Sequence, residues 1–203
     1  MQIIRAKDCP TAPWKNGGGA TTEIAAAPPG ASLDTFDWRV SMARVASDGP
    51  FSEFSGIDRT LAVVSGNGLV LSIGSNAPVT LARGSDPIGF AGDAATSARL
   101  VAGAVTDLNV MTRRRRFSHR LRQVREPEAC DFDGHDIALV LSLDGSTTIS
   151  SARDLATLGH GDAVIMTRDF EAGFRIAPDA ASECWLVLLR EHRGCWRTST
   201  APS

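Results

Sequence analysis

A run of three glycines directly follows a lysine and an asparagine near the start of the chain, in Trp14-Lys15-Asn16-Gly17-Gly18-Gly19. Glycine lacks a Cβ atom, so such a backbone can lie flush against a ligand and donate several N–H groups. Lys15 is one of only two lysines among the 203 residues. A nucleotide-binding loop would place the lysine after the glycines. The segment is therefore either a plain N-terminal loop or, as we predict, one wall of a site for a small anion. The contacting residues would be Trp14, Lys15, Asn16, Gly17 and Gly18.

Two arginines farther along the chain carry charge that suits a carboxylate. Alternation in Trp38–Ala43 places Arg39 and Ser41 on the face opposite the apolar side chains. That face points into solvent on a half-exposed strand, but into the mouth of a small β-barrel, where both faces are enclosed. Arg59 follows Asp58 at the start of another strand, where a surface ion pair is the default. Because a guanidinium matches a carboxylate in shape and charge, we predict that Arg39, Ser41 and Arg59 contact the ligand.

A third basic element lies in the middle of the chain. Asp107, Asn109, Met111 and Arg113 share one strand face, and Arg113 is predicted to join the site. The basic run from Arg113 to Arg116, which continues in Arg120, Arg122 and Arg125, is interpreted as a solvated inter-lobe strand and connector. Its expected acidic partners are Glu126, Glu128 and Asp131.

The overall charge argues against large anionic partners. The formal net charge is -2 and the pI is about 6.1, so no general attraction to nucleic acid or an anionic membrane is expected. No apolar run approaches the roughly 20 residues that span a bilayer, and the N-terminus lacks the pattern of a signal peptide. The four cysteines form no CxxC pair. We therefore expect a cytoplasmic protein whose partner is a small carboxylate metabolite, with a homodimer left open.

Metal and cofactor chemistry finds no support in the residue pattern. The four histidines do not form an H-x-H or H-x-x-x-H spacing. His119 and His192 also lie among arginines, which disfavours a cation. We predict no metal and no other cofactor. Sequence motifs of nucleophilic catalysis are missing as well.

Strand signals dominate the elements that must position these residues. Short apolar or alternating runs are bounded by turn-forming residues, and long helical periodicity is scarce. The clearest runs are 38–43, 61–64, 69–73, 108–111, 137–143 and 184–189. The stretch 116–128 is polar, and we interpret it as a connector with at most a short helix. The expected fold class is all-β, a sandwich or barrel.

An internal repeat refines this prediction. A shift of 77 residues aligns Leu61–Ile88 with Ala138–Ile165 without a gap and gives seven identities in 28 positions. The glycines at two predicted turns coincide, Gly68 with Gly145 and Gly84 with Gly161. Turn composition alone makes hairpins look alike, but two copies of one β-unit explain the match better. This pattern resembles the lobes of a double-stranded β-helix, or cupin.

The segments together resemble the HutD/Ves family of bacterial cupin-like proteins, over residues 3 to about 190. The first motif, Pro13–Gly19 followed by Thr22-Glu23-Ile24, is the most specific. Further support comes from the order of 38–41, 48–52, 56–61, 66–68, 90–93 and 107–114. The resemblance implies a bicupin of two jelly-roll-like lobes, which we place at residues 1–113 and 114–203. It also implies a role in histidine utilisation for HutD-like members, sensing an intermediate such as formylglutamate or urocanate. Ves-like members are associated with stress or cold responses.

Three hypotheses follow. The leading one is a metal-independent bicupin that binds a small anionic metabolite, in which Lys15, Arg39 and Arg59 neutralise the carboxylate and converge in the mouth of the N-terminal lobe. The competing one is a metal-free cupin enzyme that acts on a small carboxylate, with Glu23 as base and Lys15 as acid. The third is an oligomeric scaffold without a ligand.

Overall fold

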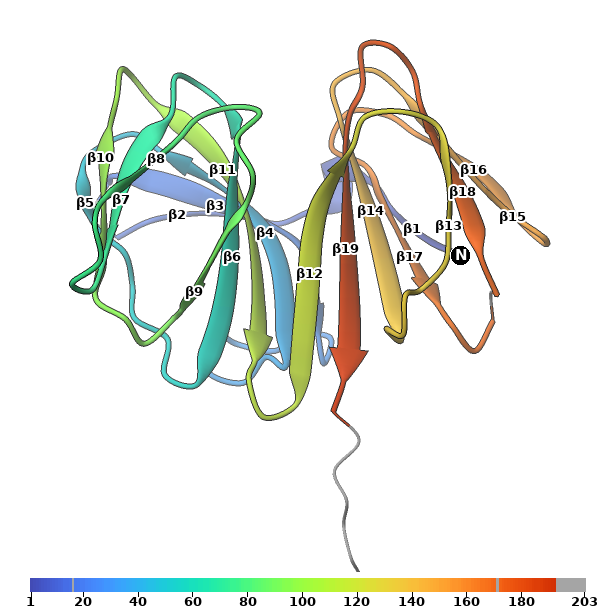
Figure 1. The fold of residues 1–203 in the computed structure, drawn as a ribbon, viewed down its shortest axis with the longest axis horizontal. Coiled ribbons are helices and arrows are strands. Elements are labelled where there is room, and N and C mark those ends of the chain that lie inside the picture. Colours follow the sequence, from blue (N-terminus) through green and yellow to red (C-terminus); the bar gives the residue numbers. More distant parts are fainter. Residues whose placement is uncertain (16, 171, 193–203) are drawn as a thin grey trace, which may run out of the picture.

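The computed structural model describes residues 1–15, 17–170 and 172–192, and nearly all of its regular structure is β-strand (Figure 1). This confirms the all-β prediction; one short 3-10 turn, η1 (Ala6–Asp8), is the helix among these residues. No helix in the described ranges is long and apolar enough to cross a membrane. The strands are β1 (Gln2–Ile4), β2 (Thr11–Pro13), β3 (Gly19–Ala27), β4 (Trp38–Val45), β5 (Gly49–Pro50), β6 (Ile57–Ser65), β7 (Leu69–Ile73), β8 (Val79–Leu81), β9 (Ile88–Ala91), β10 (Thr96–Leu100), β11 (Val105–Arg113), β12 (Phe117–Val124), β13 (Glu128–Cys130), β14 (Ile137–Leu143), β15 (Thr147–Ser151), β16 (Leu155–Leu158), β17 (Ala163–Thr167), β18 (Phe174–Pro178) and β19 (Glu183–Glu191).

The strands form two lobes, each with a larger and a smaller sheet (Figure 1). The N-lobe joins sheet β2-β3-β4-β11-β6-β9 to sheet β5-β10-β7-β8. The C-lobe joins sheet β1-β17-β14-β19-β12 to sheet β13-β18-β15-β16. The order β4-β11-β6-β9 has its counterpart in β12-β19-β14-β17, and the smaller sheets also correspond strand for strand. The chain therefore contains one β-unit twice, as the repeat indicated.

The turns predicted from the repeat lie between corresponding strands. The first hairpin of each unit joins β6 to β7 or β14 to β15, and Gly68 and Gly145 both have positive φ angles, 99° and 60°. A Cβ on Gly68 would lie 2.3 Å from the carbonyl oxygen of Leu81, so a side chain is excluded there by close backbone approach.

Two segments differ from the expected organisation. The stretch interpreted as a connector, 116–128, contains strand β12, which pairs with β19 over its whole length. Its polar alternation is that of an edge strand: Phe117 and Leu121 are buried, whereas the residues between them are more exposed. β1 pairs with β17 and so completes the larger sheet of the C-lobe. The lobe boundary at residue 113 stays a prediction.

The larger sheets of the two lobes pack back to back. Trp38, Val40 and Leu108 of the N-lobe share a buried cluster with Leu139 and Trp185 of the C-lobe. Each lobe encloses a second cluster between its own two sheets. Both faces of β4 and β11 are consequently covered, and residues opposite the apolar stripe of β4 point into the N-lobe. That arrangement positions the site.

Candidate functional site

Polar side chains gather on the inner face of the larger N-lobe sheet. Cross-strand register places Arg39, Met111 and Arg59 side by side on β4, β11 and β6. The row two residues farther along contains Glu23, Ser41 and Asn109. Paired residues of antiparallel strands point to the same side of a sheet. The structure therefore brings both predicted arginines together inside one lobe.

Arg39 is already engaged by an acid. Its Nε lies 2.7 Å from Oε2 of Glu23, and its Nη1 donates to Oγ of Ser41 at 3.3 Å. The side chain of Arg39 is 12% exposed and that of Glu23 is 33% exposed, so this pair lies where the polar interior reaches the surface. Ser41 beneath it is buried.

Arg59 lies deeper, in a shell of aromatic rings. The residue is 6% exposed, and the carbon of its guanidinium lies 5.1 Å from the ring centres of Phe51 and Phe90 and 5.6 Å from that of Phe54. Such rings stabilise a cation through their quadrupoles. Burial lowers the pKa of Arg59 to about 10, which leaves the side chain charged at neutral pH. Its Nη1 donates to the carbonyl oxygen of Ser52 at 3.4 Å, a weak contact for a buried charge.

Asn109 links Arg59 to a buried carboxylate. Its Oδ1 accepts from Nε of Arg59 at 3.3 Å, and its Nδ2 donates to Oδ1 of Asp107 at 3.5 Å. Asp107 is 1% exposed. Burial raises the pKa of Asp107 to about 7, against the opposing effects of the Arg59 charge and the Asn109 hydrogen bond. The inner face thus offers two cations, two acids, an amide and a hydroxyl.

The C-lobe has no such interior. The inner positions of β19 hold Cys184, Leu186 and Leu188, all in the apolar cluster that fills that lobe. Phe132 and Phe174 add an edge-to-face aromatic pair with ring centres 5.5 Å apart. Since both lobes share one strand order, folding does not require polar residues inside a lobe. The polar interior of the N-lobe therefore points to binding or catalysis.

Trp14 closes one end of this polar face. Its indole Nε1 donates to Oγ1 of Thr21 at 2.8 Å, and Thr21 pairs with Ala43 in the row of Asp107. The tryptophan ring also lies over Gly19, where a Cβ would be 3.0 Å from two ring carbons and 2.2 Å from the carbonyl oxygen of Arg44. One glycine of the run is therefore required by packing.

The other members of the glycine-rich segment lie apart from the arginines. Gly19 pairs with Val45, six residues along β4 from Arg39, which is about 20 Å at the usual strand rise. Lys15 and Gly17 are exposed in the turn beyond this pair, and Gly18 is buried there. Asn16 lies outside the described residues. The expected convergence of Lys15 with Arg39 and Arg59 is thus not what the register gives, and Lys15 does not join Glu23 in an acid–base pair.

Arg113 has a different task in this structure. It donates from Nε and Nη2 to the carbonyl oxygen of Phe36, at 3.1 and 2.9 Å, and from Nη2 to that of Asp34 at 3.0 Å. These bonds hold the segment before β4, whose Phe36 is fully buried against Ile57 and Met111. Arg113 therefore anchors backbone, and its Nε also lies 3.8 Å from Oδ1 of Asp37.

Sequence reasoning placed Asp107 and Asn109 on one face but did not assign them to the site. The strand pairing that sets them beside Ser41 and Arg59 is not visible in a local pattern. Phe51 and Phe54 lie in a turn-rich segment before Arg59, and that proximity was the available signal for the aromatic shell.

The histidines in the described ranges do not form a metal centre. Across residues 1–15, 17–170 and 172–192, no three His, Cys, Asp or Glu side chains form a group that could hold an ion. His119 bridges the lobes instead, with Nδ1 2.7 Å from Oγ1 of Thr112 and Nε2 2.8 Å from Oγ1 of Thr60. The prediction of a metal-free site stays a prediction; the cationic surroundings of Arg39 and Arg59 support it.

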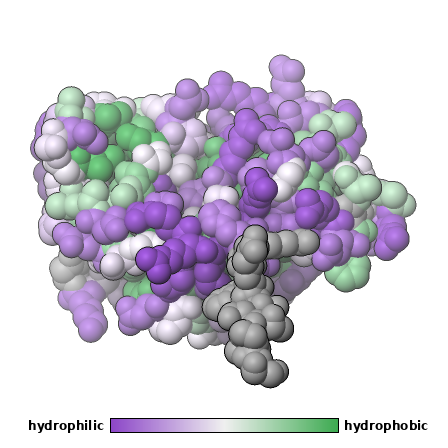
Figure 2. Space-filling model, turned by 60° about the horizontal axis from the view of Figure 1, so that its bottom comes forward, coloured by the Kyte–Doolittle hydropathy of each residue, from purple (hydrophilic) through white to green (hydrophobic). Residues whose placement is uncertain are grey.

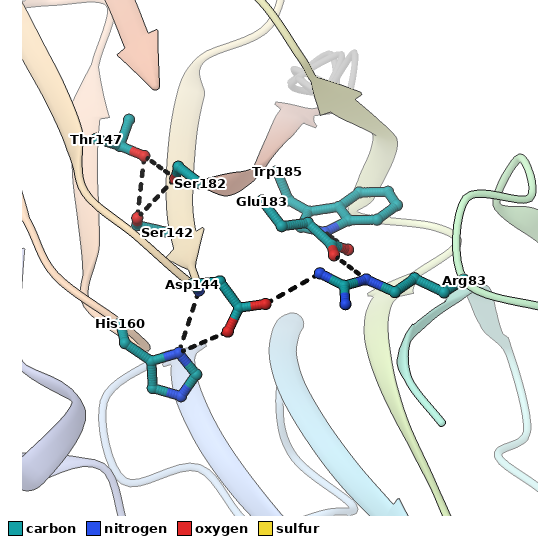
Figure 3. A network of polar contacts seen from close by, with 8 residues as sticks. All are labelled: Arg83, Ser142, Asp144, Thr147, His160, Ser182, Glu183 and Trp185. Atoms are coloured by element: carbon teal, nitrogen blue, oxygen red, sulfur yellow. Dashed lines mark hydrogen bonds and ion pairs between the residues drawn. The ribbon is translucent and has the colours of Figure 1, made fainter. Parts of the chain in front are cut away.

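A second polar cluster connects Arg83 of the N-lobe with residues of the C-lobe (Figure 3). Arg83 donates to the buried Glu183 at 2.8 Å and to Asp144 at 3.0 Å, and Trp185 donates to Glu183 at 3.0 Å. Ser142, Thr147 and Ser182 form a closed ring of hydroxyls beside it. Glu183 accepts from Arg83 and Trp185, and the three hydroxyls bond to one another, so both groups are satisfied within the protein, which indicates a structural connection.

The arginine run lies on the hydrophilic middle of the bottom face, where β11 turns into β12 (Figures 1 and 2). One of the expected acids, Glu128, pairs with an arginine of the basic run, whereas the run from Arg113 to Arg116 pairs with other acids. Arg114 pairs with Asp58 at 2.7 Å and with Asp93 at 3.1 Å, and Arg116 pairs with Asp37 at 2.8 Å. Of the expected acids, Glu128 pairs with Arg122. These pairs neutralise much of the run.

Comparison with known sequences identifies relatives. The sequence model of the family HutD matches residues 6–186. An uncharacterized 21.2 kDa protein from the hutC 3′ region of Pseudomonas putida is 38% identical over 122 residues, 60% of this chain and 63% of that protein. Protein Ves of Citrobacter koseri is 38% identical over 123 residues, with the same coverage of 60% and 63%. The chain thus spans less than two thirds of the length of these curated relatives.

Solved structures support the same relationship. HutD from Pseudomonas fluorescens SBW25 superposes with a TM-score of 0.80 at 29% identity, over 94% of this chain and 98% of that one. A conserved protein of unknown function from Pseudomonas aeruginosa PAO1 gives 0.81 at 30% identity, over 93% and 98%. A cupin 2 conserved barrel domain protein from Leptotrichia buccalis gives 0.55 at 12% identity, over 90% and 96%, a likeness of fold alone. The fold is cupin-like.

Proposed function

Because the chain belongs to the HutD family, we propose that it is a metal-independent bicupin that binds a small anionic metabolite inside the N-lobe. The ligand is a carboxylate of the formylglutamate or urocanate type, and the protein acts as a sensor or regulator of histidine utilisation. The name of the family and the hutC-region relative in Pseudomonas putida support the connection to this pathway.

The observation that carries the proposal is the contrast between the two lobe interiors. The same strand order encloses the buried Arg59, Asn109 and Asp107 in one lobe. In the other lobe, the buried inner residues among those described are apolar apart from the hydroxyls of Ser142 and Thr147, which bond to each other. Burying a charge costs several kcal/mol unless a partner compensates for it. The fold does not need these buried charges to be stable, so we attribute their presence in the N-lobe to the binding of a ligand.

Arg39 and Arg59 are the anion-binding groups in this proposal, with Ser41 and Asn109 as orienting groups. Charge-assisted hydrogen bonds to a carboxylate contribute roughly 1.5–3 kcal/mol each, so two of them support micromolar binding after ordering costs. The internal acids do not prevent this. Glu23 is 33% exposed and can leave Arg39 for solvent when a ligand carboxylate arrives.

Two measurements on the full chain test the proposal. Isothermal titration calorimetry with N-formyl-L-glutamate and with urocanate measures binding, and chromatography of the recovered ligand measures conversion. One-to-one binding with intact ligand supports a sensor, whereas turnover identifies the enzyme hypothesis. If neither compound binds or reacts at millimolar concentration, the proposed function is wrong.

A further inference from the structure

Asp107 is a buried carboxylate with few partners. Its one hydrogen bond from a side chain comes from Asn109 at 3.5 Å, the long end of the usual range. Within the described ranges it forms no ion pair with Arg59 or any other cation. Its direct neighbours across the strands are Ala43 and Val63, which are both apolar, and Thr21 lies beyond Ala43 in the same row.

Such a carboxylate is costly in its charged form. An ionised acid in an apolar interior loses hydration that a single long hydrogen bond does not replace. The corresponding strand of the C-lobe carries no charge at these positions, since the inner positions of β19 hold Cys184, Leu186 and Leu188. Packing therefore does not explain an acid at this place in the N-lobe.

The charged groups around Asp107 come from three other strands. Arg59 of β6 is linked to Asp107 by the hydrogen bonds of Asn109. Arg39 of β4 lies in the same row as Arg59 and is paired with Glu23 of β3. A smaller-sheet residue, Leu71 of β7, adds only apolar surface to this interior. When an anion joins the arginines, an ionised Asp107 repels it, whereas a neutral acid offers an O–H donor.

We infer that Asp107 belongs to the ligand site and holds a proton when the anion is bound, so that binding is coupled to proton uptake from solvent. The inference rests on the proposed function and adds to it a residue and a coupling. The carboxylate takes up one proton to give the neutral acid, no covalent bond to the ligand forms, and the ligand keeps its charge. Burial raises the pKa of Asp107 to about 7, so this carboxyl is partly ionised near neutral pH while no ligand is bound.

The experiment is calorimetry of the full chain with N-formyl-L-glutamate at pH 6, 7 and 8, in buffers with different ionisation enthalpies. The ligand carboxyls titrate near pH 4 and stay ionised throughout. Uptake is expected to rise from about 0.1 proton per ligand at pH 6 to about 0.9 at pH 8, while Kd increases about tenfold. Asp107→Asn imitates the neutral acid, so its Kd should be constant over this range and its uptake absent.

Asp133→Asn is the matched control, because this acid is exposed in an ion pair with Arg120 far along the C-lobe. It should retain the uptake of the unmodified protein. Binding without proton uptake, or uptake that persists in Asp107→Asn, overturns the inference and leaves the proposed function standing. No binding at any pH overturns the proposed function as well. If Asp107→Asn does not fold, Asp107→Ala is measured in the same way, and proton uptake that persists in it overturns the inference.

Discussion

The Nε atom of Arg39 lies 2.7 Å from Oε2 of Glu23, on the inner face of the larger N-lobe sheet. The acid accepts from the Nε donor, which the proposed ligand would use, and thereby neutralises the arginine while no ligand is bound. Glu23 is consequently an internal competitor for the site.

Removal of this competitor should strengthen binding. Glu23→Gln keeps the shape of the side chain but removes its charge, so no carboxylate of the protein competes with the ligand for the guanidinium of Arg39. The affinity for N-formyl-L-glutamate should rise about tenfold, or roughly 1.4 kcal/mol, by calorimetry. Glu53→Gln is the control, because Glu53 is exposed and forms no ion pair within the described part of the chain. Equal affinity in both variants would count against competition by Glu23.

Loss of the arginine should have the opposite effect. Arg39→Ala removes one of the two proposed anion-binding groups, so affinity should fall at least about tenfold. The melting temperature should change little, because the Glu23 left behind is 33% exposed and can hydrate. Arg120→Ala, at an exposed arginine of the C-lobe, serves as the control for both calorimetry and thermal unfolding. Unchanged affinity in Arg39→Ala would remove Arg39 from the site.

His119 should make folding stability sensitive to acid. Burial lowers the pKa of His119 from 6.5 to about 4, so the folded state favours the neutral ring. A lowered pKa contributes stability that is present above pH 6.5 and is lost as the pH falls toward 4, on the order of 3 kcal/mol in all. Denaturant unfolding between pH 7 and pH 4 should show this slope. His119→Gln should reduce it, whereas the exposed His160→Gln should not; equal slopes would contradict the assignment.

The connection between the lobes should depend on Arg83. Its guanidinium neutralises Glu183, which is 5% exposed on the opposite lobe (Figure 3). Arg83→Ala leaves that carboxylate with only the indole N–H of Trp185, so the free energy of unfolding should drop by about 1–3 kcal/mol. Arg153→Ala, at an exposed arginine without a side-chain partner in the described ranges, should change it by less than about 0.5 kcal/mol. A double variant with Glu183→Gln should recover most of the loss.

Local pattern was enough to predict much of this structure. Alternation placed Arg39 and Ser41 opposite the apolar stripe, because it depends only on neighbouring residues. The 77-residue repeat indicated two lobes, because two local segments can be compared directly in the sequence. The positions of Lys15 and Asp107 depend on register between distant strands, which no local pattern contains. The strand β12 was missed because an edge strand beside an arginine run has few apolar residues to mark its period.

The most direct test of the central claim is a crystal structure of the protein grown with N-formyl-L-glutamate. We predict the ligand inside the N-lobe, with one carboxylate within hydrogen-bond distance of Arg39 and Arg59 and with Glu23 turned away from Arg39. Ligand bound only at surface arginines such as Arg168 or Arg190, with the Glu23–Arg39 pair intact, would contradict the account.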